Sequence, residues 1–338
     1  MSGIYLGVLQ EDDQLYPYLA YEVLGQILGH SCHRPVFDVF RLGENSSNWS
    51  IFRYAERHTG VNLVGKFYGD KWLGGREVGN FALRSGLMWR EFDNLHRLRA
   101  LGFDAPPYRV ARPIATSERI NCALIEEFVF GRNLDDLIGA AIADGQEERL
   151  LGPLGDVAGF LAALHSRAPQ DAQIDPSGTI GRLGDALAGL AQHPIAGPDQ
   201  MRRLGELHAR RSAELGPSEG PLALIHGDAR PAHFLFTGEG ETTAIDLEHL
   251  RHGDCAEDIG KMAGEMRHLF LWHGSSPQAA APLARHFIDQ YLQRLTAPAP
   301  DRDALLARVR IYTACVGLAI GQISWMDPAH RRAIVADA

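Results

Sequence analysis

The sequence predicts an α+β protein with strands in its first part and helices in most of its second part. Runs rich in β-branched and aromatic residues recur between residues 36 and 129, and turn residues separate them. From about residue 131 the composition changes to Ala, Leu, Gly and Arg at helical spacing. Residues 222–248 are an exception, because two apolar runs flank a loop there and a return strand follows a short turn. Strands followed by helices indicate the α+β class.

Composition sets limits on the architecture and on the partners. The chain has 338 residues, of which 45% are hydrophobic, and this is enough for a sizeable core in one or two domains. The net charge of -9 disfavours general nucleic-acid binding and is compatible with a cationic small-molecule partner. The same acidic balance is typical of proteins kept soluble by surface charge, so the charge by itself leaves both interpretations open.

Cysteine usage and the apolar runs indicate the compartment. The four cysteines include no Cys-x-x-Cys pair, so we expect neither a zinc site nor a disulfide framework: Cys32, Cys122, Cys255 and Cys315. The first residues lack the basic start and apolar stretch of a signal peptide, and no apolar run is long enough for a membrane helix. We therefore predict a reduced, cytoplasmic protein without a membrane partner.

The first elements in chain order are a helix and a pair of strands. Apolar residues at helical spacing predict a helix within residues 12–28, with Gly29 as its stop; this helix either packs on the following domain or borders a substrate cleft. Strands are expected at Val36–Leu42 and Ser50–Tyr54. The polar loop between them, which contains Ser46 and Ser47, is either an ordinary hairpin turn or a loop that aims N–H groups and hydroxyls at phosphates.

A lysine interrupts the next apolar strand. Lys66 lies within the predicted strand Asn62–Tyr68, and a buried ammonium group needs a partner. The following helix contains Met88–Leu98, and Glu91 flanks its apolar face. Two further strands are expected at Val110–Ala115 and Asn121–Val129.

The second part is mainly helical. The segments with apolar residues at helical spacing are Asp156–His165, Leu183–Leu190, Met201–Arg211, Lys261–Trp272, Pro277–Leu295 and Asp301–Met326. His165 is expected to be a core or capping histidine. Glu257 and Glu265 are expected to be plain surface charges, although they could also meet a cationic substrate.

The exceptional stretch at residues 222–248 contains most of the candidate catalytic residues. An apolar run ends in His226-Gly-Asp228, a loop with Arg230 follows, and a second run begins after His233. The return strand after the turn ends at Asp246. Strand ends and the loops after them are where scaffolds hold reactive groups, and two carboxylates placed there suit orientation of a hydroxyl and binding of Mg²⁺.

This stretch resembles the catalytic and metal-binding segments of the aminoglycoside phosphotransferase family. The family pattern is His-x-Asp, four residues and Asn, followed by a hairpin and a metal-binding Asp; here His233 replaces the Asn. The segment Gly253–Gly260 is similar to the next family segment, with Cys255 in place of Pro. The resemblance implies a bilobal protein-kinase-like fold, with a small antiparallel-sheet lobe at residues 1–130 and a larger, mainly helical lobe at 131–338.

The resemblance also implies a nucleotide site for ATP or GTP. Lys66, paired with Glu91, would reach the α and β phosphates, and the loop with Ser46 and Ser47 would position the nucleotide. Residues 126–129, which include Glu126 and Phe128, would form the hinge between the lobes. Their backbone groups would bind the adenine edge, so we expect their side chains to matter little.

Roles in the reaction follow from the same resemblance. Asp228 would align the acceptor hydroxyl, Arg230 would steady the transferring phosphoryl group, and His226 would orient the loop. Asp246 would hold Mg²⁺, with His233 as a second metal ligand or acting through a water. Asp254 and Asp258 are expected to brace the loop or cap the following helix, and Asp258 to contact Arg230 or His226.

The predicted function is transfer of a nucleotide γ-phosphate to a hydroxyl of a small molecule. Aminoglycoside-like antibiotics, sugars and amino alcohols, charged or neutral, all remain candidate acceptors, and the protein is expected to be a monomer or a homodimer. Protein substrates are disfavoured because the segment between Asp246 and Asp254 is too short for a kinase-type activation segment. A nucleotide-binding scaffold that lacks activity is the alternative, and only His233 argues for it.

Overall fold

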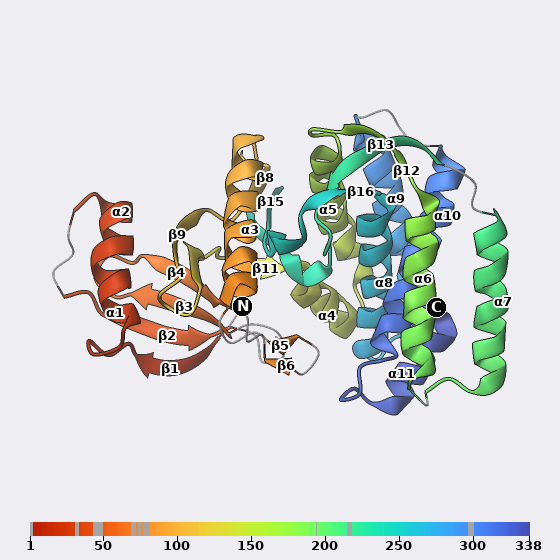
Figure 1. Ribbon diagram of the computed structural model, residues 1–338, viewed down its shortest axis with the longest axis horizontal. Coiled ribbons are helices and arrows are strands. Elements are labelled where there is room, and N and C mark those ends of the chain that lie inside the picture. Colours follow the sequence, from red (N-terminus) through yellow and green to blue (C-terminus); the bar gives the residue numbers. More distant parts are fainter. Residues whose placement is uncertain are drawn as a thin grey trace. The chain divides into compact units, whose positions relative to one another are not determined.

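The computed structural model describes residues 3–30, 34–42, 50–68, 72–73, 76–77, 81–193, 195–214, 218–238, 240–296 and 301–338. The chain divides into two compact units (Figure 1). The N-terminal unit comprises Met1–Gly131 and Thr243–Glu248, and the helical unit comprises Arg132–Thr242 and His249–Ala338. The α+β class is confirmed. The boundary that returns the chain to the N-terminal unit falls inside β15 (Glu241–Ala244).

A six-stranded antiparallel sheet forms the body of the N-terminal unit. Its strands in spatial order are β1 (Ile4–Val8), β2 (Phe37–Arg41), β3 (Ser50–Glu56), β4 (Asn62–Phe67), β10 (Ala123–Glu127) and β9 (Pro113–Ser117). Residues two apart in a strand point to the same face, and Leu63 and Phe67 of β4 accordingly enter one core. The sequence analysis did not predict β1.

An N-terminal helical segment packs on this sheet. It comprises α1 (Leu15–Pro17), a π-helical turn (Tyr18–Val23) and α2 (Leu24–Leu28), and it ends at Gly29 with a φ of 71°. Gly29 therefore takes the left-handed conformation that terminates many helices, as predicted. Leu19, Val23 and Leu24 of this segment share a hydrophobic core with Phe37 and other sheet residues.

The rest of the N-terminal unit consists of the long helix α3 (Phe81–Ala100) and short strands. These strands are β5 (Trp72–Leu73), β6 (Arg76–Glu77), β7 (Asp104–Ala105) and β8 (Tyr108–Val110). The predicted strand Val110–Ala115 was wrong as one element, because β8 ends at Val110 and β9 begins at Pro113. Proline has no N–H group and so cannot donate in the middle of a strand ladder, which favours this break.

Helices make up most of the helical unit (Figure 1). They are α4 (Leu134–Asp144), α5 (Leu151–His165), α6 (Pro176–Ala191), α7 (Pro198–Glu214), α8 (Ala256–Trp272), α9 (Ala281–Arg294), α10 (Arg302–Ile320) and α11 (Pro328–Asp337), with short 3₁₀ turns at Glu147–Leu150 and Pro277–Ala280. The strands that begin in this unit are β11 (Arg132–Asn133), β12 (Gln170–Ile174), β13 (Ser218–Ile225), β14 (Phe234–Gly238), β15 and β16 (Arg251–Gly253). Local signals explain the start of α4, because the Asn133 side chain accepts a hydrogen bond from the Asp136 N–H group.

The C-terminal helices correct one prediction. The expected helix Asp301–Met326 ends at Ile320, and a separate helix, α11, follows it. Asp327 caps α11 by accepting from the His330 N–H group, and Pro328 occupies the first turn. An Asp-Pro pair is a helix-start signal, so the sequence contained the information for this second helix.

Apolar packing between the helices forms the core of the helical unit. One cluster joins α6, α10 and α11 through residues such as Leu190, Leu318 and Ile334. Within the described part of the chain, no helix is both long and apolar enough to cross a membrane.

Candidate active site

Lys66 lies at the centre of a buried charge cluster in the N-terminal unit. Only 3% of its surface is exposed, and its Nζ is 2.5 Å from Glu91 Oε1, 2.6 Å from Asp246 Oδ1 and 3.5 Å from Glu126 Oε1. The predicted ion pair with Glu91 is present. Tyr68 directly follows β4, two residues after Lys66, and its hydroxyl donates to Glu91 Oε2.

Three carboxyl groups around one ammonium group change the ionisation of the cluster. Burial disfavours the charge on Lys66, but the carboxylates outweigh burial and hold the pKa of Lys66 well above its ordinary value. Burial raises the pKa of Glu126 to about 8. Lys66 lowers this pKa, but the negative charges of Glu91 and Asp246 raise it and offset part of the effect of Lys66. Glu126 is therefore mostly protonated at neutral pH, and its Oε1 has no hydrogen-bond partner within the described residues.

The side chain of Glu126 thus corrects one expectation. We expected hinge side chains to matter little, but Glu126 is 2% exposed and faces Lys66. Strand alternation explains this placement, because Leu124 on the same face of β10 lies opposite Lys66 in the ladder between β10 and β4.

Asp246 has an unusual backbone conformation. Its φ is 60°, a left-handed value that few residues other than glycine adopt, although Asp tolerates it better than most. About a third of its side chain remains exposed, and Oδ1 meets Lys66. Such conformations are found at functional sites that the surrounding structure holds in place.

The loop His226–His233 in the helical unit contains the other candidate residues. It begins after β13, and Gly227 has a φ of 78°. A Cβ atom at Gly227 would collide with the backbone carbonyl oxygen of His249 and with the side chains of His249 and Arg251. Both facts require glycine between His226 and Asp228.

Asp258 anchors this loop. Its carboxylate, which is fully buried, accepts hydrogen bonds from the backbone N–H groups of His226 at 2.7 Å and Gly227 at 2.9 Å. His165 Nε2 lies 3.0 Å from Asp258 Oδ2, and the Tyr291 hydroxyl lies 2.9 Å from His165 Nδ1. Of the two contacts expected for Asp258, the one with His226 is therefore present, and His165 is a core residue as predicted.

Asp228 has a cationic partner that the sequence analysis did not identify. The Nζ of Lys261 on α8 lies 2.5 Å from Asp228 Oδ1. Burial works against ionisation of Asp228, but Lys261, followed by His233 and Arg230, lowers the pKa of Asp228 far below its ordinary value. A helix repeats every 3.6 residues, so Asp258, Lys261 and Glu265 share one face of α8. This helical spacing was the signal in the sequence that could have indicated Lys261 as a residue facing the loop.

The positions of two glutamates on α8 correct a second expectation. Arg230 Nη2 lies 2.8 Å from Glu265 Oε1, and Arg251 Nη2 lies 2.6 Å from Glu257 Oε1. The prediction that both glutamates are surface charges was wrong, because each is only 7% exposed. A buried carboxylate requires a cation. Arg230 lies in the candidate loop, and Arg251 lies in β16, shortly after the predicted return strand.

Asp254 secures the start of α8. Its Oδ1 accepts from the Ala256 N–H group at 3.0 Å, and its Oδ2 lies 2.7 Å from Arg308 Nε. It therefore both caps the helix and braces the preceding segment.

Comparison with known families decides the identity of this arrangement. The phosphotransferase enzyme family, APH, matches residues 85–306, which are more than half of the chain. The chain belongs to this phosphotransferase family. The resemblance predicted from the segments at residues 226–260 is confirmed, and the protein is a phosphotransferase enzyme.

Solved structures of small-molecule kinases share the fold. A choline/ethanolamine kinase family protein from Mesorhizobium loti aligns with a TM-score of 0.55 at 16% identity, over 88% of this chain and 86% of that one. Glucosamine kinase aligns with a TM-score of 0.56 at 16% identity, over 90% of both chains. Amicoumacin kinase hAmiN aligns with a TM-score of 0.55 at 18% identity, over 96% of this chain and 91% of that one. The predicted protein-kinase-like fold is confirmed, and no curated protein sequence matches significantly.

In this phosphotransferase, His233, which the resemblance set at the position of the family's Asn, ties the loop together. Its Nδ1 lies 2.9 Å from the backbone oxygen of Asp228, so Nδ1 carries the hydrogen and donates. The rings of His226 and His233 stack with their centroids 5.9 Å apart. This hydrogen bond directs Nε2 of His233, rather than Nδ1, toward any other partner.

The remaining candidate residues belong to the expected hinge and the expected nucleotide loop. The Phe128 N–H group donates to the Asn62 carbonyl oxygen at 3.0 Å, so this donor is engaged within the N-terminal unit. The Phe128 ring packs against Phe130 and under the Arg53 guanidinium group. Ser46 and Ser47 lie outside the described residues.

Proposed function

We propose that this phosphotransferase is a small-molecule kinase that transfers the γ-phosphate of ATP or GTP to a hydroxyl group. One observation carries the proposal: Lys66 and Asp246, 180 residues apart in sequence, form an ion pair at 2.6 Å. The lysine of a strand and the aspartate of a strand end are the two groups that kinase-type sites use for phosphates and metal.

The N-terminal unit holds the groups for the nucleotide. Glu91 fixes the ammonium group of Lys66, which would then contact phosphate oxygens in place of Asp246. Glu91 and Asp246 together carry more negative charge than the single charge of Lys66 offsets, which favours a cation beside Asp246.

Asp246 fits Mg²⁺ by its chemistry. Mg²⁺ prefers oxygen ligands and is commonly bound by one or two carboxylates together with substrate phosphates. Asp246 supplies such oxygens and is partly exposed, and no cluster of three ligating side chains occurs among the described residues. Bound Mg²⁺ would neutralise phosphate charge. His233 donates from Nδ1 to the loop, so we assign it first to loop positioning and only second to the metal.

Asp228 is assigned to orientation of the acceptor hydroxyl. Lys261 keeps its carboxylate ionised, and a carboxylate with such a low pKa accepts a hydrogen bond well but takes up a proton poorly. Phosphoryl transfer through a loose transition state needs positioning more than strong base catalysis. Arg230, anchored by Glu265 and with part of its side chain exposed, would contact phosphoryl oxygens, and His226 holds the loop.

The acceptor class comes from what the similar proteins are named for. Those proteins are kinases of choline or ethanolamine, glucosamine, aminoglycosides and amicoumacin, all of them hydroxylated small molecules. We propose an acceptor of this kind.

A transfer screen tests the function. The purified protein with Mg²⁺ and γ-labelled ATP or GTP is offered amino sugars, aminoglycosides, amicoumacin and amino alcohols, and transfer of label to one class is expected. Asp228→Asn serves as the inactive control, and Asp185→Asn, at an exposed position on α6, serves as the matched active control. Nucleotide binding without transfer to any acceptor would instead support the scaffold alternative.

A further inference from the structure

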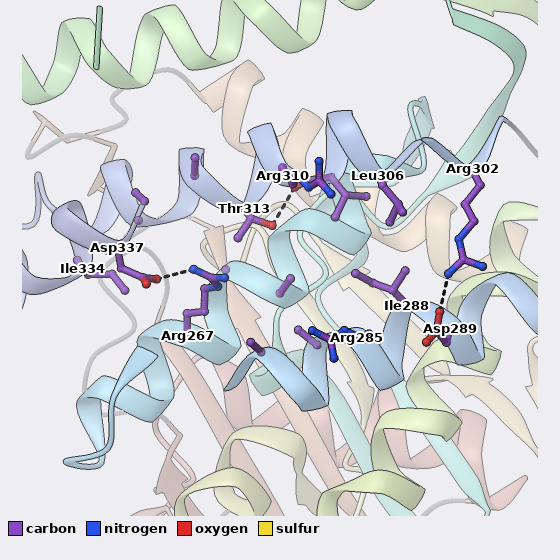
Figure 2. Close-up of a pocket in the computed structure, with 18 residues that line it drawn as sticks. Arg267, Arg285, Ile288, Asp289, Arg302, Leu306, Arg310, Thr313, Ile334 and Asp337 are labelled. Atoms are coloured by element: carbon purple, nitrogen blue, oxygen red, sulfur yellow. Dashed lines mark hydrogen bonds and ion pairs between the residues drawn. The ribbon is translucent and has the colours of Figure 1, made fainter. Parts of the chain in front are cut away.

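A cavity lies in the helical unit, between α8, α9, α10 and α11 (Figure 2). Its volume of about 460 Å³ is within the range of small-molecule pockets. Small residues form much of its lining, including Ala263, Gly264, Ala284 and Gly317, and they leave space where larger side chains would meet. Ile288, Leu306 and Val309 add apolar walls.

The charges of this cavity do not cancel. The lining includes four arginines, Arg267, Arg285, Arg302 and Arg310, two aspartates, Asp289 and Asp337, and Ala338, the last residue of the sequence, with its terminal carboxylate. Both aspartates are already paired, because Arg302 lies 2.9 Å from Asp289 and Arg267 lies 2.7 Å from Asp337, as the dashed lines in Figure 2 show.

Two of the lining arginines, both exposed to solvent, are left without a paired carboxylate in the part of the chain that the structure describes. Among the described residues, Arg285 on α9 and Arg310 on α10 have no carboxylate partner. The Thr313 hydroxyl is neutral and donates a hydrogen bond to the Val309 carbonyl oxygen. In a chain with a net charge of -9, four guanidinium groups against three carboxylates leave a net positive charge at this cavity, which attracts anions.

This cavity is separate from the candidate loop. Lys261 and Glu265 contact the loop from one face of α8, whereas Ala263 and Arg267 face the cavity. Each residue turns a helix by about 100°, so positions two apart lie on nearly opposite sides. A ligand in the cavity would therefore touch α8 without entering the Asp228 loop.

We propose that this cavity binds a small phosphate monoester with an apolar body. Guanidinium groups bind oxyanions through paired N–H donors, and two of them match the double negative charge of a phosphate monoester. The Ala, Ile, Leu and Val lining accommodates the apolar body.

Titration calorimetry with the full chain tests the assignment. The probes are phenyl phosphate, benzoate, benzyl alcohol and inorganic phosphate. Phenyl phosphate is expected to bind most tightly, more weakly at high salt, and without displacement by excess Mg²⁺-nucleotide. Displacement by nucleotide, equal binding of benzyl alcohol, or tighter binding of benzoate would overturn the proposal.

Variants locate the binding. The double change Arg285→Ala with Arg310→Ala is expected to weaken phenyl phosphate binding about 10- to 100-fold. Arg332→Ala, at an exposed arginine of α11 outside the cavity, is the matched control and should stay within about twofold, the scatter expected for a distant surface change. Ala314→Leu should fill the cavity and abolish binding, while circular dichroism shows a folded protein. Unchanged binding in the double variant would refute the site.

Discussion

Lys66 and Lys261 each pair with an aspartate at close range, yet their surroundings differ in one decisive way. Lys66 is almost completely buried and has three carboxyl groups within 3.5 Å, whereas Lys261 is about one-third exposed and pairs with Asp228. The pKa of Glu126 is consequently raised to about 8, while the pKa of Asp228 is lowered.

The difference shows that a nearby lysine does not by itself set the charge of a buried carboxyl group: burial raises the pKa of both carboxyl groups, and the balance of neighbouring acids and bases decides the net direction. The cluster in the N-terminal unit has an excess of acids and is suited to accept a cation. The Asp228 loop has a partner for each charge, because Arg230 meets Glu265 and Lys261 meets Asp228. Its arrangement is suited to hold one carboxylate ionised and in place.

Removing the carboxylate of Asp228, which Lys261 balances, should have the largest effect on activity. Asp228→Asn is expected to lower kcat by about 10²- to 10⁴-fold, because the hydroxyl loses its charged acceptor. The nucleotide KM should change little, and Asp185→Asn should match the parent. Steady-state kinetics measures both values. A variant with parental kcat would remove Asp228 from the mechanism.

Replacing the lysine of the acid-rich cluster should affect nucleotide binding next. Lys66→Met is expected to raise the dissociation constant for Mg²⁺-nucleotide about 10- to 100-fold, the range for loss of a charged hydrogen bond. Fluorescence titration measures it. Lys261→Met is the comparison, because it removes the same charge from the other cluster and should leave nucleotide affinity near the parental value. Equal loss in both variants would contradict the separate roles.

The Lys261→Met protein also tests how Asp228 is kept ionised. Without the ammonium group, burial should raise the pKa of Asp228, so the acid limb of the kcat profile should move to higher pH by about one to two units. Activity at pH 8 should then recover relative to activity at pH 5. A profile with a parental acid limb would show that Lys261 has only a structural role.

The smallest expected effect concerns Glu126 and appears in stability. Its pKa is about 8 in the folded protein against an ordinary 4.5, so the folded state binds more protons between these values and loses stability as pH rises through them. Glu126→Gln should remove that loss and become more stable than the parent above pH 8, by on the order of 2 kcal/mol. Urea unfolding from pH 5 to 9 measures this, with Glu22→Gln, at an exposed position, as the control. Parallel pH dependences of the Glu126→Gln and parent proteins would oppose the assignment.

Local patterns predicted much of the architecture. The apolar run around Lys66 predicted β4, helical spacing predicted most of α5 and of α8, and Gly29 marked the end of α2. Each depends on neighbours within a few residues, which is why a single sequence is enough. Among the elements that were missed or misjudged, β1, α11 and the break between β8 and β9 are short or depend on a cap or a proline.

Pairings across long sequence distances divide into those the family pattern supplied and those it did not. The contact between Lys66 and Glu91 followed from the resemblance. Lys261 at Asp228 and Glu265 at Arg230 did not, because nothing local distinguishes a charged helical residue in solvent from one that meets a loop. The periodicity of α8 places these residues on one face but does not say what covers that face.

From the sequence alone came the α+β class and, through the resemblance of its motifs to known segments, the phosphotransferase family, because strand and helix patterns and the order of motif residues are local properties of the chain. Only the tertiary structure decided that Glu126 turns toward Lys66 and that Asp228 has Lys261 as its partner. Burial and distance, not residue type, determine whether a carboxyl group gains or loses its proton, and both exist only after distant segments have packed together.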